Sequence, residues 1–210
     1  MDVEIWSDVV CPWCYLGKRR FEQALEAFPG RGDVTVTYRS FELDPTAPAD
    51  TTVPTVELLA GKYGMSPAQA QDAQREMEQR AEQDGLTFHM SGLRSGNTRD
   101  AHRLIQLAKD HGLQAEMVER LHQAYFTEQA SIFDHASLGR LAVEVGLDAG
   151  QVGEVLASDE YADAVQADEM LASSLGATGV PFFVLDRQFG ISGAQPAEVI
   201  ARALQQASSS

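Results

Sequence analysis

The two cysteines of the chain, Cys11 and Cys14, are the residues whose type and spacing are best suited to chemistry. Because only two residues separate them, a disulfide between them would close almost no loop and would add little to stability. A structural zinc site needs about four ligands, and the sequence contains no second cysteine pair to supply them. Two thiols at this spacing instead suit reversible thiol–disulfide exchange, in which one cysteine attacks and the other resolves the mixed disulfide.

The cysteine pair stands where a strand is expected to give way to a helix. Residues 3–6 (Val-Glu-Ile-Trp) show the pattern of a strand, and Pro12 suits the first turn of a helix because its missing N–H would have no partner there. We therefore expect Cys11 to be the N-cap and Cys14 to lie in the first turn. The free N–H groups of a helix start favour a thiolate. Cys11, at the more exposed tip, is the predicted nucleophile, and Cys14 is the predicted resolving thiol.

Two neighbours of the pair are candidate site residues. Asp8, three residues before Cys11, could exchange a proton with a buried thiol, or could be only a loop acid that caps a turn. Trp13 lies between the cysteines and carries no charge that would stabilise a thiolate, so this stabilisation rests on the helix terminus. A moderate redox potential follows as a hypothesis.

Strand patterns occur near both ends of the chain. Residues 34–41 are rich in β-branched and aromatic residues, which is typical of a strand. Residues 180–185 form a short apolar run that can turn back into a second strand at 189–192. A final helix is expected to start near Pro196.

Between these ends, from about residue 54 to residue 175, apolar residues recur at helical spacing and no strand pattern competes. The proline-rich stretch 42–55 is typical of a linker that leaves a sheet. Because the strands at the two ends need one another to form a sheet, the sequence predicts an α/β fold with a large all-helical insertion. The expected bounds are 1–45 with 158–210 for the α/β domain and 46–157 for the insertion.

The charge balance restricts the partners. Asp and Glu total 31 against 16 Lys and Arg, a net charge of −15, which disfavours nucleic acid and anionic membranes. No apolar run approaches the roughly 20 residues that span a bilayer, and the first residues lack the positive charge of a signal peptide. We expect a cytoplasmic protein, either a monomer or a homodimer.

Four segments carry a resemblance to a known family: Trp6–Cys14 (WSDVVCPWC), Asn97-Thr98 with Ala101–Arg103, Gly179–Phe183, and Gly190–Gln195. With these segments the chain resembles the DsbA-like branch of the thioredoxin fold, and most closely its FrnE-type members. The resemblance implies a thioredoxin fold with a helical insertion and a thiol-disulfide oxidoreductase. It also implies a disulfide- or thiol-containing protein or small molecule as partner, and no cofactor beyond the redox-active pair Cys11 and Cys14.

The resemblance also implies roles for individual residues. In that family the bond before the proline that matches Pro181 is cis and lies against the cysteines. Such a proline leaves the backbone groups of Val180 able to pair with an extended substrate. Pro12 and Trp13 would contact substrate, and His102 lies in a matched segment, although it could equally be a packed or capping histidine. The other histidines lack ligand spacing, so no metal is assigned.

The 2-hydroxychromene-2-carboxylate isomerases and the kappa-class glutathione transferases are similar in layout, but there a serine stands where this chain has Cys11. Two alternative functions therefore stay open. The chain could be a glutathione-dependent isomerase or transferase of a small electrophile, with glutathione as co-substrate at 180–181 and 192–193. It could also be a redox-inactive module that binds peptides beside Pro181.

Overall fold

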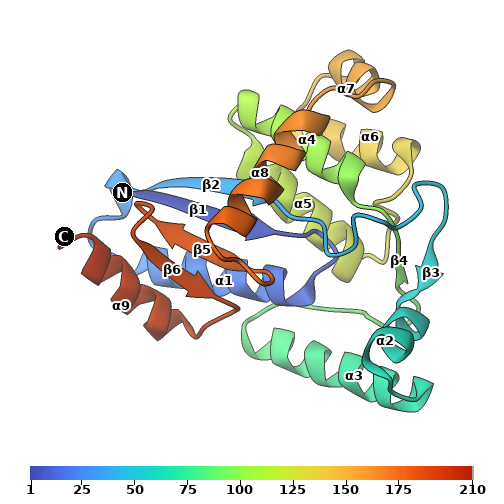
Figure 1. The fold of residues 1–210 in the computed structure, drawn as a ribbon, viewed down its shortest axis with the longest axis horizontal. Coiled ribbons are helices and arrows are strands. Elements are labelled where there is room, and N and C mark those ends of the chain that lie inside the picture. The colour runs from blue at the N-terminus through green and yellow to red at the C-terminus, as the bar shows by residue number, and fades with distance from the viewer. Residues whose placement is uncertain (210) are drawn as a thin grey trace. The chain divides into compact units, whose positions relative to one another are not determined.

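A computed structural model describes residues 1–209 of the chain (Figure 1). The elements in chain order are β1 (Asp2–Ser7), α1 (Pro12–Glu26), a 3-10 turn (Arg31–Asp33), β2 (Thr35–Ser40), β3 (Val53–Pro54), α2 (Thr55–Tyr63), α3 (Pro67–Gln83), β4 (Arg94–Ser95), α4 (Arg99–Asp110), α5 (Gln114–Phe126), α6 (His135–Val145), α7 (Ala149–Leu156), α8 (Ala162–Ser174), β5 (Phe182–Leu185), β6 (Phe189–Ser192) and α9 (Ala197–Ala207).

The chain divides into two compact units. One consists of Met1–Leu43 together with the residues from Asp163 onward, and the other of Asp44–Ala162. The sequence placed these two boundaries after residues 45 and 157. We call the first the sheet unit and the second the helical unit.

The sheet unit is built on four strands in the order β2-β1-β5-β6. β1 runs parallel to β2, with Ile5 opposite Tyr38, and antiparallel to β5, with Ile5 opposite Phe183. β5 and β6 form a hairpin through Asp186 and Arg187, both at positive φ. The mixed α/β architecture therefore matches the sequence-based prediction, because strands from both ends of the chain complete one sheet.

Successive residues of β5 point to opposite faces of the sheet, and each face has its own helices. On one face the ring of Phe183 stacks on that of Phe21 from α1, with centroids 5.8 Å apart, and α9 packs beside α1 (Figure 1). On the other face Phe182 joins Trp6 of β1 and Ala172 of α8 in a buried apolar cluster. The sheet is thus covered on both faces, as the burial of all four residues of β5 requires.

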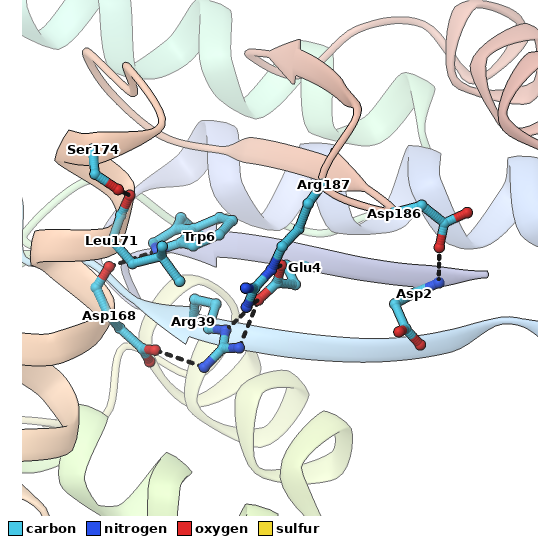
Figure 2. Close-up of polar contacts among 9 residues, drawn as sticks. All are labelled: Asp2, Glu4, Trp6, Arg39, Asp168, Leu171, Ser174, Asp186 and Arg187. Atoms are coloured by element: carbon cyan, nitrogen blue, oxygen red, sulfur yellow. Dashed lines mark hydrogen bonds and ion pairs between the residues drawn. The ribbon is translucent and has the colours of Figure 1, made fainter.

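The α8 face of the sheet also carries a network of charged side chains (Figure 2). Arg39 of β2 binds Glu4 of β1 at 2.6 Å and Asp168 of α8 at 2.9 Å. Arg187 binds Glu4 at 3.1 Å. Burial alone would raise the pKa of Glu4, but the hydrogen bonds from Arg187 and Arg39 outweigh it and hold this pKa below its usual value. The stabilisation is therefore present at neutral pH and is lost as the pH falls through the lowered pKa.

Asp168 joins α8 to two strands at once. Its Oδ2 accepts a hydrogen bond from the backbone N–H of Ser40 at 3.0 Å, and its backbone carbonyl accepts one from the indole N–H of Trp6 at 2.8 Å. Asp168 is only 4% exposed. These bonds fix the rotation of α8 on the sheet, because the carboxylate and the carbonyl of one residue meet partners on different strands.

The helical unit consists of α2 to α7 and a two-stranded ladder. In this ladder Val53 pairs with Ser95 and Pro54 with Arg94. The expectation that no strand occurs between residues 54 and 175 was therefore wrong. Two-residue strands contain no alternation that a sequence pattern could show, and this pair joins segments about 40 residues apart in the sequence. No helix among residues 1–209 combines the length and the apolar character needed to cross a bilayer.

Replacing Asp168 tests how much the charged network contributes. D168A leaves Arg39 with one carboxylate fewer and the buried Ser40 N–H without its acceptor, so we expect the free energy of unfolding to fall by about 3 kcal/mol. Urea denaturation monitored by tryptophan fluorescence measures this. The control is Q166A on the exposed side of the same helix, which should change stability by about 0.5 kcal/mol or less. Equal losses of stability in D168A and Q166A would contradict a stabilising role for the charged network around Asp168.

Candidate functional site

The cysteine pair lies at the N-terminus of α1, as the sequence predicts. Cys11 is the N-cap and Pro12 the first helical residue, and the backbone carbonyl of Cys11 accepts hydrogen bonds from the N–H groups of Cys14 at 3.0 Å and Tyr15 at 3.3 Å. Both cysteines are free thiols. The expected difference in exposure is small: Cys11 is 4% exposed and Cys14 1%.

The segment before β5 meets Cys11 from across the sheet unit. The bond between Val180 and Pro181 is cis, as the resemblance implied, and the Sγ of Cys11 lies 3.8 Å from the Val180 carbonyl oxygen. The carbonyl of Pro181 accepts a hydrogen bond from the N–H of Gly193 at 2.8 Å. This hydrogen bond holds the segment 180–181 against the end of β6 and so helps to fix the position of the Val180 carbonyl relative to the Cys11 thiol.

Cys14 is the more deeply buried thiol, and its surroundings act in opposite directions on its acidity. Burial raises the pKa of the Cys14 thiol well above its usual value, and the hydrogen bond and charge of the neighbouring Cys11 raise it further. Two hydrogen bonds lower it, one from the backbone of Asp8 and one from the side chain of Ser7. A thiolate at Cys14 thus depends on two donors at the end of β1.

Asp8 is buried, with 1% of its surface exposed, and its carboxylate accepts a hydrogen bond from the backbone N–H of Leu43 at 2.8 Å. The side chain therefore joins the loop after β1 to the segment after β2, which is a structural use of the acid. Its backbone forms a hydrogen bond with Cys14, and proton exchange between its carboxylate and a buried thiol stays a prediction.

Ser7 is the site residue that the sequence reasoning missed. It is the last residue of β1 and is 8% exposed. The available signal was its position directly after the buried strand residue Trp6, at the edge of the sheet where Cys11 and Cys14 were expected. A single serine at a strand end is too common for its type alone to single it out.

The remaining predicted residues differ in their surroundings. Pro12 is half-buried and Trp13 is 41% exposed on the first turn of α1, so both lie beside Cys11. His102 belongs to α4 of the helical unit, where it is 1% exposed. Its role in a site stays a prediction. Within residues 1–209 no three His, Cys, Asp or Glu side chains gather in a group that could hold a metal ion.

Several known proteins are similar to this chain over almost its full length. A crystal structure of the probable DsbA oxidoreductase SCO1869 from Streptomyces coelicolor is 50% identical and superposes with a TM-score of 0.96, covering 100% of this chain and 90% of that one. A structure of a 2-hydroxychromene-2-carboxylate isomerase is 16% identical with a TM-score of 0.75, over 98% and 95% of the two chains. It shows the shared fold.

Among curated proteins, the uncharacterised protein YwbO of Bacillus subtilis (strain 168) is 29% identical over 204 residues, 96% of this chain and 94% of its own. The family model described as a DSBA-like thioredoxin domain matches residues 2–205. The match spans both ends of the chain and the helical unit between them. The thioredoxin fold with a helical insertion is thereby confirmed, and the chain belongs to the family of DSBA-like thioredoxin domains.

Proposed function

We propose that this protein is a thiol-disulfide oxidoreductase in which Cys11 is the nucleophile and Cys14 the resolving thiol. The family and the relative with 50% identity support thiol-disulfide oxidoreductase chemistry in general. The observation that carries the residue roles is the placement of two free thiols at the N-terminus of α1, with the Sγ of Cys11 3.8 Å from the Val180 carbonyl.

In the reducing direction the Cys11 thiolate attacks one sulfur of a substrate disulfide. A mixed disulfide forms, and the other substrate sulfur leaves as a thiolate and takes up a proton. The Cys14 thiolate then attacks Cys11 and releases the second substrate thiol. Two substrate thiols form while Cys11 and Cys14 are oxidised to a disulfide, and an external dithiol or thiol must reduce this disulfide before the next cycle. Oxidation of a substrate dithiol is the same sequence in reverse.

The substrate would bind as an extended peptide beside Val180. The backbone of this residue lies two residues before β5, next to Cys11, where a peptide can add its own backbone hydrogen bonds. Trp13, partly exposed on the first turn of α1, offers an apolar contact for the residues that flank the substrate cysteine. A protein or peptide disulfide therefore suits the site better than a compact electrophile, and glutathione as co-substrate and a cytoplasmic location stay predictions.

Replacing the resolving thiol separates the proposal from its rivals. With C14A the mixed disulfide on Cys11 cannot be resolved, so incubation with a disulfide-bonded peptide should accumulate a covalent adduct at Cys11, visible by intact-protein mass spectrometry. The wild type should show little adduct, and C11A none. Absence of an adduct in C14A would favour the peptide-binding module. Undiminished turnover of a small electrophile with glutathione in C14A would favour the transferase or isomerase.

Replacing Ser7 tests how the Cys14 thiolate is stabilised. In the mixed disulfide Cys11 carries no charge, so burial and the donors Ser7 and Asp8 govern the pKa of Cys14. Because this pKa is raised, the resolving step should accelerate as the pH rises through neutrality. S7A removes one donor and raises the pKa further. If the rise is about one unit, the thiolate fraction falls about tenfold, while the nucleophilicity of the thiolate rises roughly threefold.

At pH 7 we therefore expect S7A to release substrate from the mixed disulfide about threefold more slowly than the wild type, with its pH profile displaced to higher pH. Rapid-quench measurement of substrate release at several pH values tests this. S173A, at an exposed position on α8, is the matched control and should keep the wild-type profile. Wild-type release rates in S7A, or equal slowing of S7A and S173A, would contradict the role of the hydroxyl.

A further inference from the structure

Gly17 is a glycine in the interior of α1, one turn after Cys14. Glycine lowers helix stability relative to alanine because it loses more conformational freedom on folding. Its backbone lies in the ordinary helical region, since it is absent from the residues with positive φ. The backbone conformation therefore gives no reason for a glycine here, and the reason must lie in what approaches the helix at this position.

The space around Gly17 is filled by the segment that leads into β5. A Cβ atom at this position would lie 2.8 Å from the Cγ of Pro181, 3.4 Å from its Cβ and 3.4 Å from the Cζ of Phe183. Contacts below 3.0 Å essentially never occur for real Cβ atoms. The pyrrolidine ring is rigid and Phe183 is fully buried, so neither can yield by rotating about a side-chain bond. Any side chain at position 17 must move either α1 or the segment 180–181.

Movement of this segment would change the reactive geometry. Val180 precedes Pro181 directly, and its carbonyl oxygen lies 3.8 Å from the Sγ of Cys11. On the far side the carbonyl of Pro181 is tied to the N–H of Gly193 at 2.8 Å. The segment is thus held by Gly193, directly after β6, and lies against α1 where α1 lacks a side chain. The missing Cβ of Gly17 sets how closely the Val180 backbone approaches the Cys11 thiol.

We propose that Gly17 is a positioning residue that selects peptide disulfides, because it fixes the distance between the Val180 backbone and Cys11. The proposal rests on the proposed function and deepens it. An extended peptide must pair with the Val180 backbone while its disulfide sulfur reaches the Sγ of Cys11. The spacing between Val180 and Cys11 must therefore suit both contacts at the same time. A small disulfide without a peptide backbone needs only the thiol.

The test compares two disulfides in G17A. We measure the rate constant for reaction of the reduced protein with a disulfide-bonded peptide and with bis(2-hydroxyethyl) disulfide. The wild type should react with both. G17A should react at least tenfold more slowly with the peptide and within about twofold of the wild type with the small disulfide. The matched control is G139A, which also adds a methyl group to a helix interior but meets no atom within 4 Å, and should leave both rates unchanged.

The possible results distinguish the role of Gly17 from the proposed thiol-disulfide oxidoreductase activity. A wild type that reacts with neither disulfide overturns the proposed function. A wild type that reacts with both, together with a G17A variant that slows both equally or neither, overturns the role of Gly17 alone. A selective loss of the peptide reaction supports it, since general destabilisation would not change the ratio of the two rates.

A double-mutant comparison covers the case in which G17A folds poorly. P181A removes the Cγ atom that lies closest to the added methyl group. We expect G17A to lower the melting temperature in the Pro181 background and to lower it less in the P181A background, because the 2.8 Å contact with Cγ is then absent while the atoms at 3.4 Å remain. An equal loss in both backgrounds would show that the contact with Pro181 is not what excludes a side chain at position 17.

Discussion

The packing of α1 against β5 is the constraint on which the candidate site depends. Phe21 stacks on Phe183, and one turn nearer the cysteines Gly17 meets Pro181, so a single face of the helix follows a single face of the strand. The cysteines lie at the N-terminus of that helix, and Val180 directly precedes the proline. Because thiol exchange requires the attacking sulfur and the bound peptide to be in register, this contact decides whether the two halves of the site meet.

The opposite face of the sheet is held by a different kind of interaction. There α8 is joined to the strands by Asp168, through an ion pair with Arg39 and bonds to Ser40 and Trp6, as well as by apolar packing. Hydrogen bonds and paired charges depend on the direction of approach, a requirement that the hydrophobic effect alone does not impose. Since the chain runs from α8 through residues 175–181 into β5, a fixed α8 also fixes where that segment begins.

The two thiols are held in unequal environments although they are only three residues apart. Cys11 faces a backbone carbonyl next to the strand that would receive a peptide, while Cys14 is buried behind it and depends on Ser7 and the backbone of Asp8 to carry a negative charge. Both thiols are nearly buried, so their partners rather than their exposure distinguish them. Cys11 lies beside the backbone that would receive a peptide, which suits the attacking role. The net charge of −15 opposes a thiolate anywhere on the molecule, so these local donors must supply its stabilisation.

The sequence by itself determined the cysteine pair at a helix start, the strands at both ends and the α/β class, because each leaves a local pattern: Pro12 after Cys11, β-branched runs, and helical spacing between them. It could not indicate the ladder of Val53 and Ser95, the network around Asp168, or the roles of Ser7 and Gly17. Only the tertiary structure decided these. The Sγ of Cys11 and the carbonyl of Val180 are 169 residues apart, and no local pattern reports which surfaces two distant segments will press together.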